Sequence, residues 1–299
     1  MPMKTYAMMI LGCKVNDYEA TYVREKLDQH FTETDFKDKA DLYLIFTCCV
    51  TNTAEAKTRK FIHDARRNNP EAYIVAIGCL SQISPEAEVF EDVDLLIGSQ
   101  RKDEIVDLIL DHAKGKLVEK EISSDFEHLY VESYPTRSRS FLKVQDGCNQ
   151  FCSYCIIPYA RGRERSGDHV KILEEAKILS RINKEIVLTG IHTGRYNDGE
   201  YDLYMLLNDM KDIEDLETIR LSSIEITEIS DRIIELMASN EKFARHLHIP
   251  VQSCNDEILR SMSRPYTIEE FKNRVAYIRE RIPDISISTD LIVGFPGED

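Results

Sequence analysis

Short apolar runs alternate with stretches of helical periodicity along most of the 299 residues, and this alternation limits the possible fold more than any other feature. In the first part of the chain, apolar runs at residues 6–11 and 41–46 are followed by amphipathic stretches at residues 18–31 and 54–67. Strands separated by helices are typical of a parallel sheet with helices on both faces. We therefore predict an α/β domain with a parallel sheet over residues 1–115.

A second alternating series starts at residue 139. Its predicted strands occupy residues 141–144, 186–188, 218–221, 246–249 and 285–292, with helical stretches between them. Five strands separated by helices are typical of a (β/α) barrel. A chain of this length is also long enough to form two domains, each with its own hydrophobic core. We therefore predict a partial barrel over residues 139–299. The polar segment at residues 116–138 is expected to be a linker or an edge element.

The composition favours a protein of a reducing compartment that does not cross a membrane. No apolar run approaches the roughly 20 residues of a membrane-spanning helix, and the apolar stretch near the N-terminus is shorter than that of a signal peptide. The eight cysteines are then expected to stay reduced. Clustered thiols under those conditions hold metal more often than they form disulfides. We expect a cytoplasmic protein with no membrane partner.

The formal net charge of −15 argues against a general nucleic-acid binder, because non-specific affinity for phosphate comes from lysine and arginine. Any contact with RNA must then be local. Two basic stretches can supply it, namely Lys57, Arg59, Lys60, Arg66 and Arg67 in the first domain and Arg161, Arg163 and Arg165 in the second. Each stretch, taken alone, is equally compatible with a solvated helix face or loop.

Three closely spaced cysteines, Cys148-x3-Cys152-x2-Cys155, give the strongest chemical signal. So short a segment cannot pair all three thiols as disulfides, whereas three thiolates can hold three irons of a cubane 4Fe–4S cluster and leave the fourth iron open. An open position is typical of catalytic metal use. The alternatives are a zinc site completed by a histidine, and chance. Zinc sites usually combine a Cys-x2-Cys pair with a second distant pair, which this sequence lacks.

The Cys-x3-Cys-x-aromatic-Cys pattern, with Tyr154 as the aromatic residue, resembles the signature of the radical S-adenosylmethionine superfamily. The resemblance implies that the open iron takes the amino and carboxylate groups of S-adenosylmethionine. An electron from the cluster then cleaves this cofactor to methionine and a 5′-deoxyadenosyl radical. By the same resemblance, Tyr154 is expected near the adenine.

Three further cysteine positions each follow a predicted strand of the first domain, namely Cys13, Cys48 or Cys49, and Cys79. The carboxyl ends of parallel strands lie along one edge of a sheet, where open α/β folds bind ligands. Three cysteines far apart in the sequence are therefore expected to converge. Taken singly, each is more often a buried small residue than a ligand. Taken with the three of the second domain, they suggest two clusters.

This arrangement resembles the methylthiotransferases, which carry an auxiliary 4Fe–4S cluster on three cysteines of an N-terminal α/β domain. In that family the middle cysteine follows a threonine in an Asn-Thr-Cys turn, which here reads Phe46-Thr47-Cys48. The resemblance therefore assigns the auxiliary cluster to Cys13, Cys48 and Cys79. Adjacent residues of an extended strand point to opposite faces, so we expect only Cys48 of the adjacent pair to face the cluster.

Later stretches, at the ends of the predicted barrel strands, also match this family. By resemblance they line the S-adenosylmethionine pocket, and strand ends are where barrel enzymes place their sites. Together with Tyr154, the residues assigned to this pocket are Gly190, Ser222, Glu225, Gln252 and Gly294. Cys254 stands where the family usually has glycine, and we expect it to be a packing substitution rather than a ligand.

The loops around the first-domain cysteines indicate the substrate. Leu11-Gly12-Cys13-Lys14-Val15-Asn16 and the stretch at residues 49–59 resemble the enzymes that act on N6-threonylcarbamoyladenosine. The resemblance implies transfer of a methylthio group to C2 of that nucleoside, at position 37 in the anticodon loop of transfer RNA. An electron donor such as flavodoxin or ferredoxin is expected as a further partner. The alternatives are the isopentenyladenosine of transfer RNA, a small-subunit ribosomal protein, and a truncated, inactive iron–sulfur protein.

The family usually continues beyond the barrel into a small β-rich RNA-binding domain of the TRAM type. The sequence stops just after a predicted strand, with the residues Gly294-Phe295-Pro296-Gly297-Glu298-Asp299. We therefore expect a barrel that is truncated at its C-terminus, and no TRAM-type domain within residues 1–299. Beyond the cluster ligands, the sequence identifies no catalytic side chain.

Overall fold

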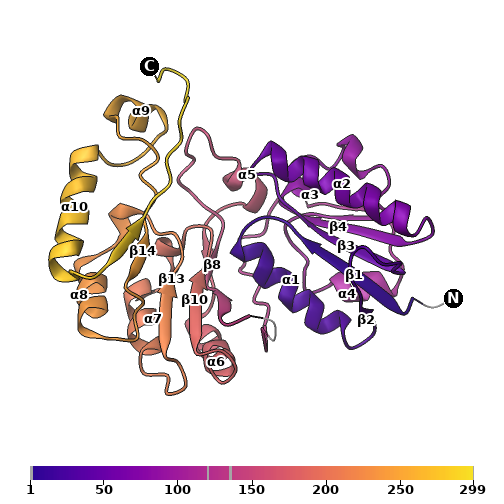
Figure 1. Cartoon of the computed structure of the whole chain (residues 1–299), viewed down its shortest axis with the longest axis horizontal. Coiled ribbons are helices and arrows are strands. Elements are labelled where there is room, and N and C mark those ends of the chain that lie inside the picture. The colour runs from indigo at the N-terminus through magenta and orange to yellow at the C-terminus, as the bar shows by residue number, and fades with distance from the viewer. Residues whose placement is uncertain (1–2, 120, 135–136, 299) are drawn as a thin grey trace. The chain divides into compact units, whose positions relative to one another are not determined.

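The computed structural model describes residues 3–119, 121–134 and 137–298. The chain divides into two compact units (Figure 1). The first unit contains Met1–Glu132 and Ile156–Arg163, and the second contains Ser133–Cys155 and Glu164–Asp299. The short segment after Cys155 therefore belongs to the first unit, although the residues on either side of it belong to the second.

The first unit is built on a six-stranded sheet with the order β2-β1-β3-β4-β5-β6. Every pair of neighbouring strands in this order is parallel. The strands are β1 (Thr5–Ile10), β2 (Thr32–Glu33), β3 (Leu42–Thr47), β4 (Tyr73–Gly78), β5 (Leu95–Ile97) and β6 (Gly115–Leu117). The predicted parallel α/β sheet is thus confirmed.

Helices cover both faces of this sheet because alternate strand residues enter two different apolar clusters. Leu44 of β3 packs in a cluster with residues of α1 (Lys14–Leu27) and α4 (Ile105–Leu110). Its neighbour Ile45 packs in the other cluster with residues of α2 (Asn52–Asn68). The short helical elements of this unit are α3 (Cys79–Ile83), η1 (Glu88–Phe90) and α5 (Ile157–Arg161).

Most of the segment expected to be a linker packs in the first unit, which extends to Glu132. Its beginning forms the edge strand β6, paired with β5. Further along, Leu129 and Val131 are buried, and the hydroxyl of Tyr18 donates a hydrogen bond to the carbonyl of Leu129. Most residues of this segment are polar, and only a few are buried. Its overall composition therefore indicated a linker.

The second unit contains the strands of the partial barrel. β7 (Ser140–Lys143), β10 (Glu185–Thr189) and β13 (Thr218–Leu221) form a parallel sheet. β14 (His246–His248) and β15 (Ser286–Ser288) form a second parallel pair. Parallel bridges from Ile219 to Phe243 and from Ser223 to His248 join β13 to the chain around β14. The order β7-β10-β13-β14-β15 agrees with the predicted series of barrel strands.

Helices follow these strands as the periodicity predicted, and local capping explains where they begin. The side chain of Asp168 accepts a hydrogen bond from the third residue of α6, and Thr267 forms a capping box with Glu270 at the start of α10. The helical elements are α6 (His169–Ser180), η2 (Thr193–Arg195), α7 (Leu203–Met210), η3 (Ile226–Glu228), α8 (Asp231–Ser239), α9 (Asp256–Ser261) and α10 (Ile268–Arg281). Two short antiparallel pairs are β8 (Gln145–Asp146) with β9 (Arg165–Ser166), and β11 (Asn197–Asp198) with β12 (Tyr201–Asp202).

Among the described residues, no helix combines the length and the apolar character that crossing a bilayer requires.

Candidate functional site

The cysteines of the first unit follow three adjacent strands of its sheet. Cys13 follows β1, Cys48 follows β3, and Cys79 follows β4 as the first residue of α3. Because β3 lies between β1 and β4 in a parallel sheet, the three cysteines leave the same edge. The structure therefore brings together the three positions that the sequence singled out.

Gly12 allows the loop of Cys13 to approach Cys48 closely. Its φ is +107°, a conformation that residues with a side chain rarely adopt. A Cβ atom at this position would lie 3.2 Å from the Cβ and 3.3 Å from the Sγ of Cys48. Any residue larger than glycine would thus press on the thiol of Cys48.

Two polar side chains tie the three strand ends to one another. The amide of Asn16 donates hydrogen bonds to the carbonyls of Leu11, at 2.7 Å, and Thr47, at 3.0 Å. The hydroxyl of Thr47 in turn donates to the carbonyl of Ile77, at 3.1 Å, and accepts from the backbone N–H of Ser81, at 3.3 Å. The segments that precede and follow the cysteines are therefore fixed in a mutual arrangement.

Cys48 and Cys79 are buried, Cys49 is half-buried and Cys13 is exposed. A hydrogen bond from the thiol of Cys49, together with the guanidinium of Arg161, lowers the pKa of Cys79 to about 6, although burial opposes the shift. Burial raises the pKa of Cys48, and the charges of Cys79 and Cys13 act in the same direction. Cys48 thus interacts with both of the other two thiols.

Cys49 lies closer to this group than the alternation of strand faces predicts, and the choice of Cys48 as the ligand stays a prediction. Strand β3 ends at Thr47, so Cys48 and Cys49 lie beyond the strand and the alternation of its faces no longer applies. The Cys49 thiol instead forms a hydrogen bond with Cys79, which raises the pKa of Cys49. The structure therefore places a fourth thiol beside the three expected ones.

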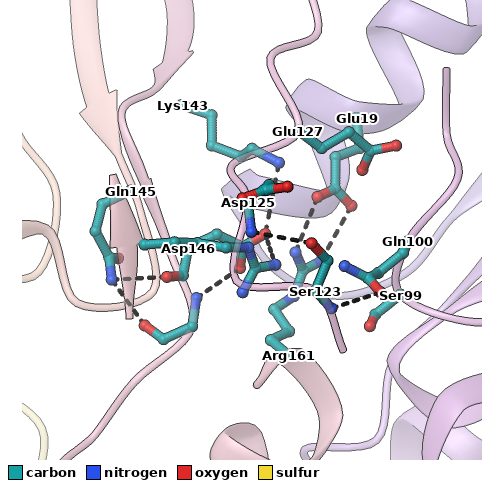
Figure 2. A network of polar contacts seen from close by, with 12 residues as sticks. Glu19, Ser99, Gln100, Ser123, Asp125, Glu127, Lys143, Gln145, Asp146 and Arg161 are labelled. Carbon is teal, nitrogen blue, oxygen red and sulfur yellow. Dashed lines mark hydrogen bonds and ion pairs between the residues drawn. The ribbon is translucent and has the colours of Figure 1, made fainter. Parts of the chain in front are cut away.

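Arg161 lies beside these cysteines, and the sequence did not assign it to the site. Its guanidinium donates hydrogen bonds to the carboxylate of Glu19, at 2.9 and 3.1 Å, and to Oδ1 of Asn16, at 2.7 Å. Figure 2 shows Arg161 and Glu19 joined by these contacts. The side chains of Arg161 and Glu19 are both fully buried. A buried, hydrogen-bonded cation at this edge favours negatively charged groups there.

The proposed RNA contact through the second basic stretch is therefore wrong for two of its three arginines. Arg161 is 0% exposed and Arg165 is 8% exposed, and Arg165 pairs with Asp146 at 3.0 Å. Arg163 is exposed. In the first stretch, Lys57, Arg59, Lys60 and Arg67 are exposed, whereas Arg66 donates to the carbonyls of Pro70, Ala72 and Asp92.

The three cysteines of the second unit lie in the loop after β8, and several groups donate to their sulfurs. The backbone N–H of Gln150 donates to Sγ of Cys148 at 3.4 Å, and the guanidinium of Arg264 donates to Sγ of Cys152 at 3.3 Å. The N–H of Cys155 donates to the carbonyl of Cys152 at 2.9 Å, which closes the turn. Donors aimed at sulfur suit cysteines that act as thiolates in an iron–sulfur cluster.

His192 and Arg264 connect this loop to the ends of the barrel strands. Nδ1 of His192 lies 3.4 Å from Sγ of Cys148, and its Nε2 lies 2.7 Å from a carboxylate oxygen of Glu228. Burial disfavours the charged imidazole, but the nearby Cys148 thiol and Glu228 carboxylate outweigh it and raise the pKa of His192 to about 10. Arg264 also forms an ion pair with Glu225.

The residues expected to line the S-adenosylmethionine pocket all belong to this unit. Tyr154 is 37% exposed and follows Cys152 in the loop. Glu225 is joined to Cys152 through Arg264, and the hydroxyl of Ser222 lies 3.2 Å from that of Thr193. Gly190 directly follows β10 and lies against the backbone of Gln145. Gln252 and Gly294 lie in the segments beyond β14 and β15. The carbonyl of Gln252 accepts from the N–H of Ile292 at 2.9 Å, and the N–H of Gly294 donates to Glu298 at 2.6 Å.

Each of the two parts of the chain matches a known protein family. Residues 142–299 match the Radical SAM superfamily, and residues 5–98 match Uncharacterized protein family UPF0004. The cobalamin-dependent S-adenosylmethionine radical enzyme OxsB has a similar fold, with a TM-score of 0.62 and 11% sequence identity. That likeness covers 97% of this chain and 49% of OxsB.

Two curated relatives carry the same name, threonylcarbamoyladenosine tRNA methylthiotransferase MtaB. The protein from Bacillus subtilis is 39% identical over 99% of this chain and 68% of its own length. The protein from Aquifex aeolicus is 41% identical over 98% of this chain and 73% of its own length. The chain therefore belongs to the radical SAM superfamily and, within it, to the transfer RNA methylthiotransferases.

Proposed function

We propose that the chain replaces the C2 hydrogen of N6-threonylcarbamoyladenosine, at position 37 of transfer RNA, with a methylthio group. The sequence identity to two enzymes named for that nucleoside carries this proposal. The residues around Cys13 and Cys49, which resemble the same enzymes, support it. Transfer RNA and reduced thiols are both cytoplasmic, so the cytoplasm is the compartment in which we expect the reaction, with flavodoxin or ferredoxin as electron donor.

The superfamily implies S-adenosylmethionine and one 4Fe–4S cluster, and the cysteine loop of the second unit fits that cluster. Cys148, Cys152 and Cys155 are the three thiols that would hold it. When bound, the cluster supplies the electron that cleaves S-adenosylmethionine. The chain's own contribution is to hold the ligands in place, with Arg264 donating to Cys152 and the Gln150 N–H donating to Cys148.

We assign a second 4Fe–4S cluster to Cys13, Cys48 and Cys79, at the strand edge of the first unit. The donor set fits, because three thiols from three adjacent strands lie beside a buried guanidinium that favours thiolates. Gly12 and Asn16 keep the loops of Cys13 and Cys48 together. The first unit is then the part of the protein that delivers sulfur, since cofactors carry the hard chemistry and the protein positions them.

Transfer RNA is a suitable substrate for such a site despite the acidic net charge. A base must leave its stack before a buried site can act on it, and a base in an unpaired loop does so at little cost. The exposed cations Lys57, Arg59, Lys60 and Arg67 on α2 are a local surface that can contact phosphate.

The substrate is tested with the reconstituted protein and two transfer RNAs, one carrying N6-threonylcarbamoyladenosine and one carrying isopentenyladenosine. We expect a nucleoside heavier by one methylthio group, seen by mass spectrometry, only with the first. Product from the isopentenyladenosine transfer RNA alone would show that the chain acts on the other nucleoside. Product from neither, with S-adenosylmethionine still cleaved, would contradict the proposed activity on transfer RNA.

The choice between the adjacent thiols is tested by iron content. We expect the Cys48→Ser protein to lose about one cluster and the Cys49→Ser protein to stay near the parent, because the Gly12 turn that precedes Cys13 closely approaches the thiol of Cys48. Iron and acid-labile sulfide are counted after anaerobic reconstitution of both variants side by side. Loss of a cluster in Cys49→Ser, with Cys48→Ser unaffected, would assign the ligand to Cys49 instead.

A further inference from the structure

A group of buried charges, of which Arg161 is one, lies beside the cysteines of the first unit. Arg161, Glu19 and Lys102 are each 0–1% exposed at the side chain. Nζ of Lys102 lies 3.7 Å from the carboxylate of Glu19 and 3.6 Å from that of Glu127. Burying charges is costly even when they are paired. Such an arrangement in a small α/β unit therefore calls for an explanation.

The segment that carries Arg161 is packed into the first unit. Ile156–Arg163 belongs to that unit by its contacts, and within it Pro158 and Ala160 are buried. Gly162, with a φ of +75°, approaches Ile122 so closely that a Cβ atom there would lie 2.8 Å from the Ile122 side chain. Helix α5 packs against α3, the helix that begins with Cys79. The guanidinium therefore has a fixed position relative to Cys79.

The guanidinium is also linked to the loops that carry the other two cysteines. It donates to Oδ1 of Asn16, and the amide nitrogen of the same Asn16 donates to the carbonyls of Leu11 and Thr47. Leu11 precedes Cys13 by two residues, and Thr47 directly precedes Cys48. The side chain of Asn16 therefore links Arg161 to the loops of both Cys13 and Cys48 through hydrogen bonds.

The two buried cations of this group share an acidic partner. The single buried carboxylate of Glu19 is shared between two cations, Arg161 and Lys102. Glu127, the second carboxylate near Lys102, is partly exposed and accepts from the backbone N–H groups of Lys102 and Asp103. Arg161 donates to Asn16 and Glu19, and its guanidinium also lowers the pKa of the neighbouring Cys79. Its positive charge is therefore close enough to Cys79 to act on a negative group held there.

We propose that Arg161 is a positioning residue of the auxiliary site, which orients the loops of Cys13 and Cys48 through Asn16 and places a fixed positive charge beside Cys79. This inference rests on the proposed auxiliary cluster. Reduction of a cluster adds one negative charge to it, and a neighbouring cation stabilises the more negative state. Arg161 therefore raises the reduction potential of the cluster held by these thiols.

The experiment uses the full chain with Cys148, Cys152 and Cys155 all replaced by alanine, so that only the auxiliary cluster remains. Iron content and midpoint potential, from a redox titration followed by electron paramagnetic resonance, are measured after anaerobic reconstitution. We expect Arg161→Met to shift the midpoint to more negative values. Arg161→Lys keeps the charge without the planar fork, so its midpoint should lie closer to the parent. Glu19→Gln removes a negative charge and should shift the midpoint to more positive values.

Arg163→Met is the matched control, because it removes the same charge from an exposed position two residues away in the same segment. Its midpoint should equal that of the parent. The double variant Glu19→Gln with Arg161→Met removes both buried partners and avoids leaving a lone buried carboxylate. If Arg161→Met does not fold, the double variant is compared with Glu19→Gln, and we still expect the more negative midpoint in the protein that lacks Arg161.

The outcomes separate the two proposals. A cluster that binds in the triple-alanine background but keeps the same midpoint with and without Arg161 would overturn the role of Arg161 and leave the auxiliary cluster intact. An absence of bound iron in that background, in every variant, would instead refute the auxiliary cluster on which the inference rests. A shift of equal size in Arg163→Met would also overturn the inference, because it would show a general effect of net charge.

Discussion

The Cys148→Ala protein is expected to form no measurable 5′-deoxyadenosine from S-adenosylmethionine under reducing conditions. Two thiolates rarely hold a cubane cluster with one iron left open for a ligand, so the loss of one cysteine should remove the cluster itself. Sγ of Cys148 also accepts a hydrogen bond from the backbone N–H of Gln150 and lies 3.4 Å from Nδ1 of His192. The measurement is chromatographic detection of 5′-deoxyadenosine after anaerobic reconstitution, with dithionite as electron source.

The matched control for this result is Cys254→Ala. Cys254 is an exposed cysteine of the same unit, and we expect its replacement to leave both the iron content and the cleavage rate at parent values. Normal formation of 5′-deoxyadenosine by Cys148→Ala would rule out the assigned cluster site. Equal loss in both variants would show that cysteine replacement damages the unit as a whole rather than the cluster.

Much of the fold could be predicted because each strand and helix has a strong local pattern. The runs at residues 41–46 and 218–221 correspond to β3 (Leu42–Thr47) and β13 (Thr218–Leu221) within one residue. The short helices α3 and α5 have only five residues each, which is too few for a periodicity to be recognised. Their packing, rather than their sequence, decides their conformation.

The convergence of Cys13, Cys48 and Cys79 could also be predicted, because parallel strands end at one edge. The position of Cys49 could not, since it depends on how the chain turns after Thr47 rather than on the strand itself. His192 lies two residues beyond the strand-end Gly190, and that position is the sequence signal that could have assigned it to the site. Arg264 lies after α9 and reaches Cys152 only through the tertiary fold.

Arg161 shows why charge patterns alone mislead. It occurs with Arg163 and Arg165 in a stretch that indicated contact with phosphate, yet only Arg163 is exposed. The apolar residues Ile157 and Pro158 just before it are the available sign that this segment packs against a core. A cation in such a segment must find buried partners. Here they come from Asn16 and Glu19, more than 140 positions earlier in the chain.

The Cys79→Ala protein is expected to separate the two halves of the reaction. S-adenosylmethionine cleavage should remain measurable, because the three cysteines of the second unit are unchanged. Methylthio transfer to transfer RNA should fall by more than about 100-fold. A loss of up to about 100-fold is typical when a residue that only hydrogen-bonds to a metal ligand is removed. Both quantities are measured on one sample, as 5′-deoxyadenosine and as methylthio-nucleoside by mass spectrometry.

Cys79 is well suited to this test because its surroundings argue for a thiolate rather than for a packing role. It is 4% exposed, and a buried thiol without polar neighbours would keep its proton, since burial disfavours the charged form. The hydrogen bond from Cys49 and the guanidinium of Arg161 instead lower its pKa. Circular dichroism is used to monitor the thermal unfolding of the apo-protein, and it checks that the Cys79→Ala substitution leaves the fold intact. Methylthio product at the parent rate from a folded Cys79→Ala protein would show that Cys79 is a core residue, and the auxiliary cluster would then need different ligands.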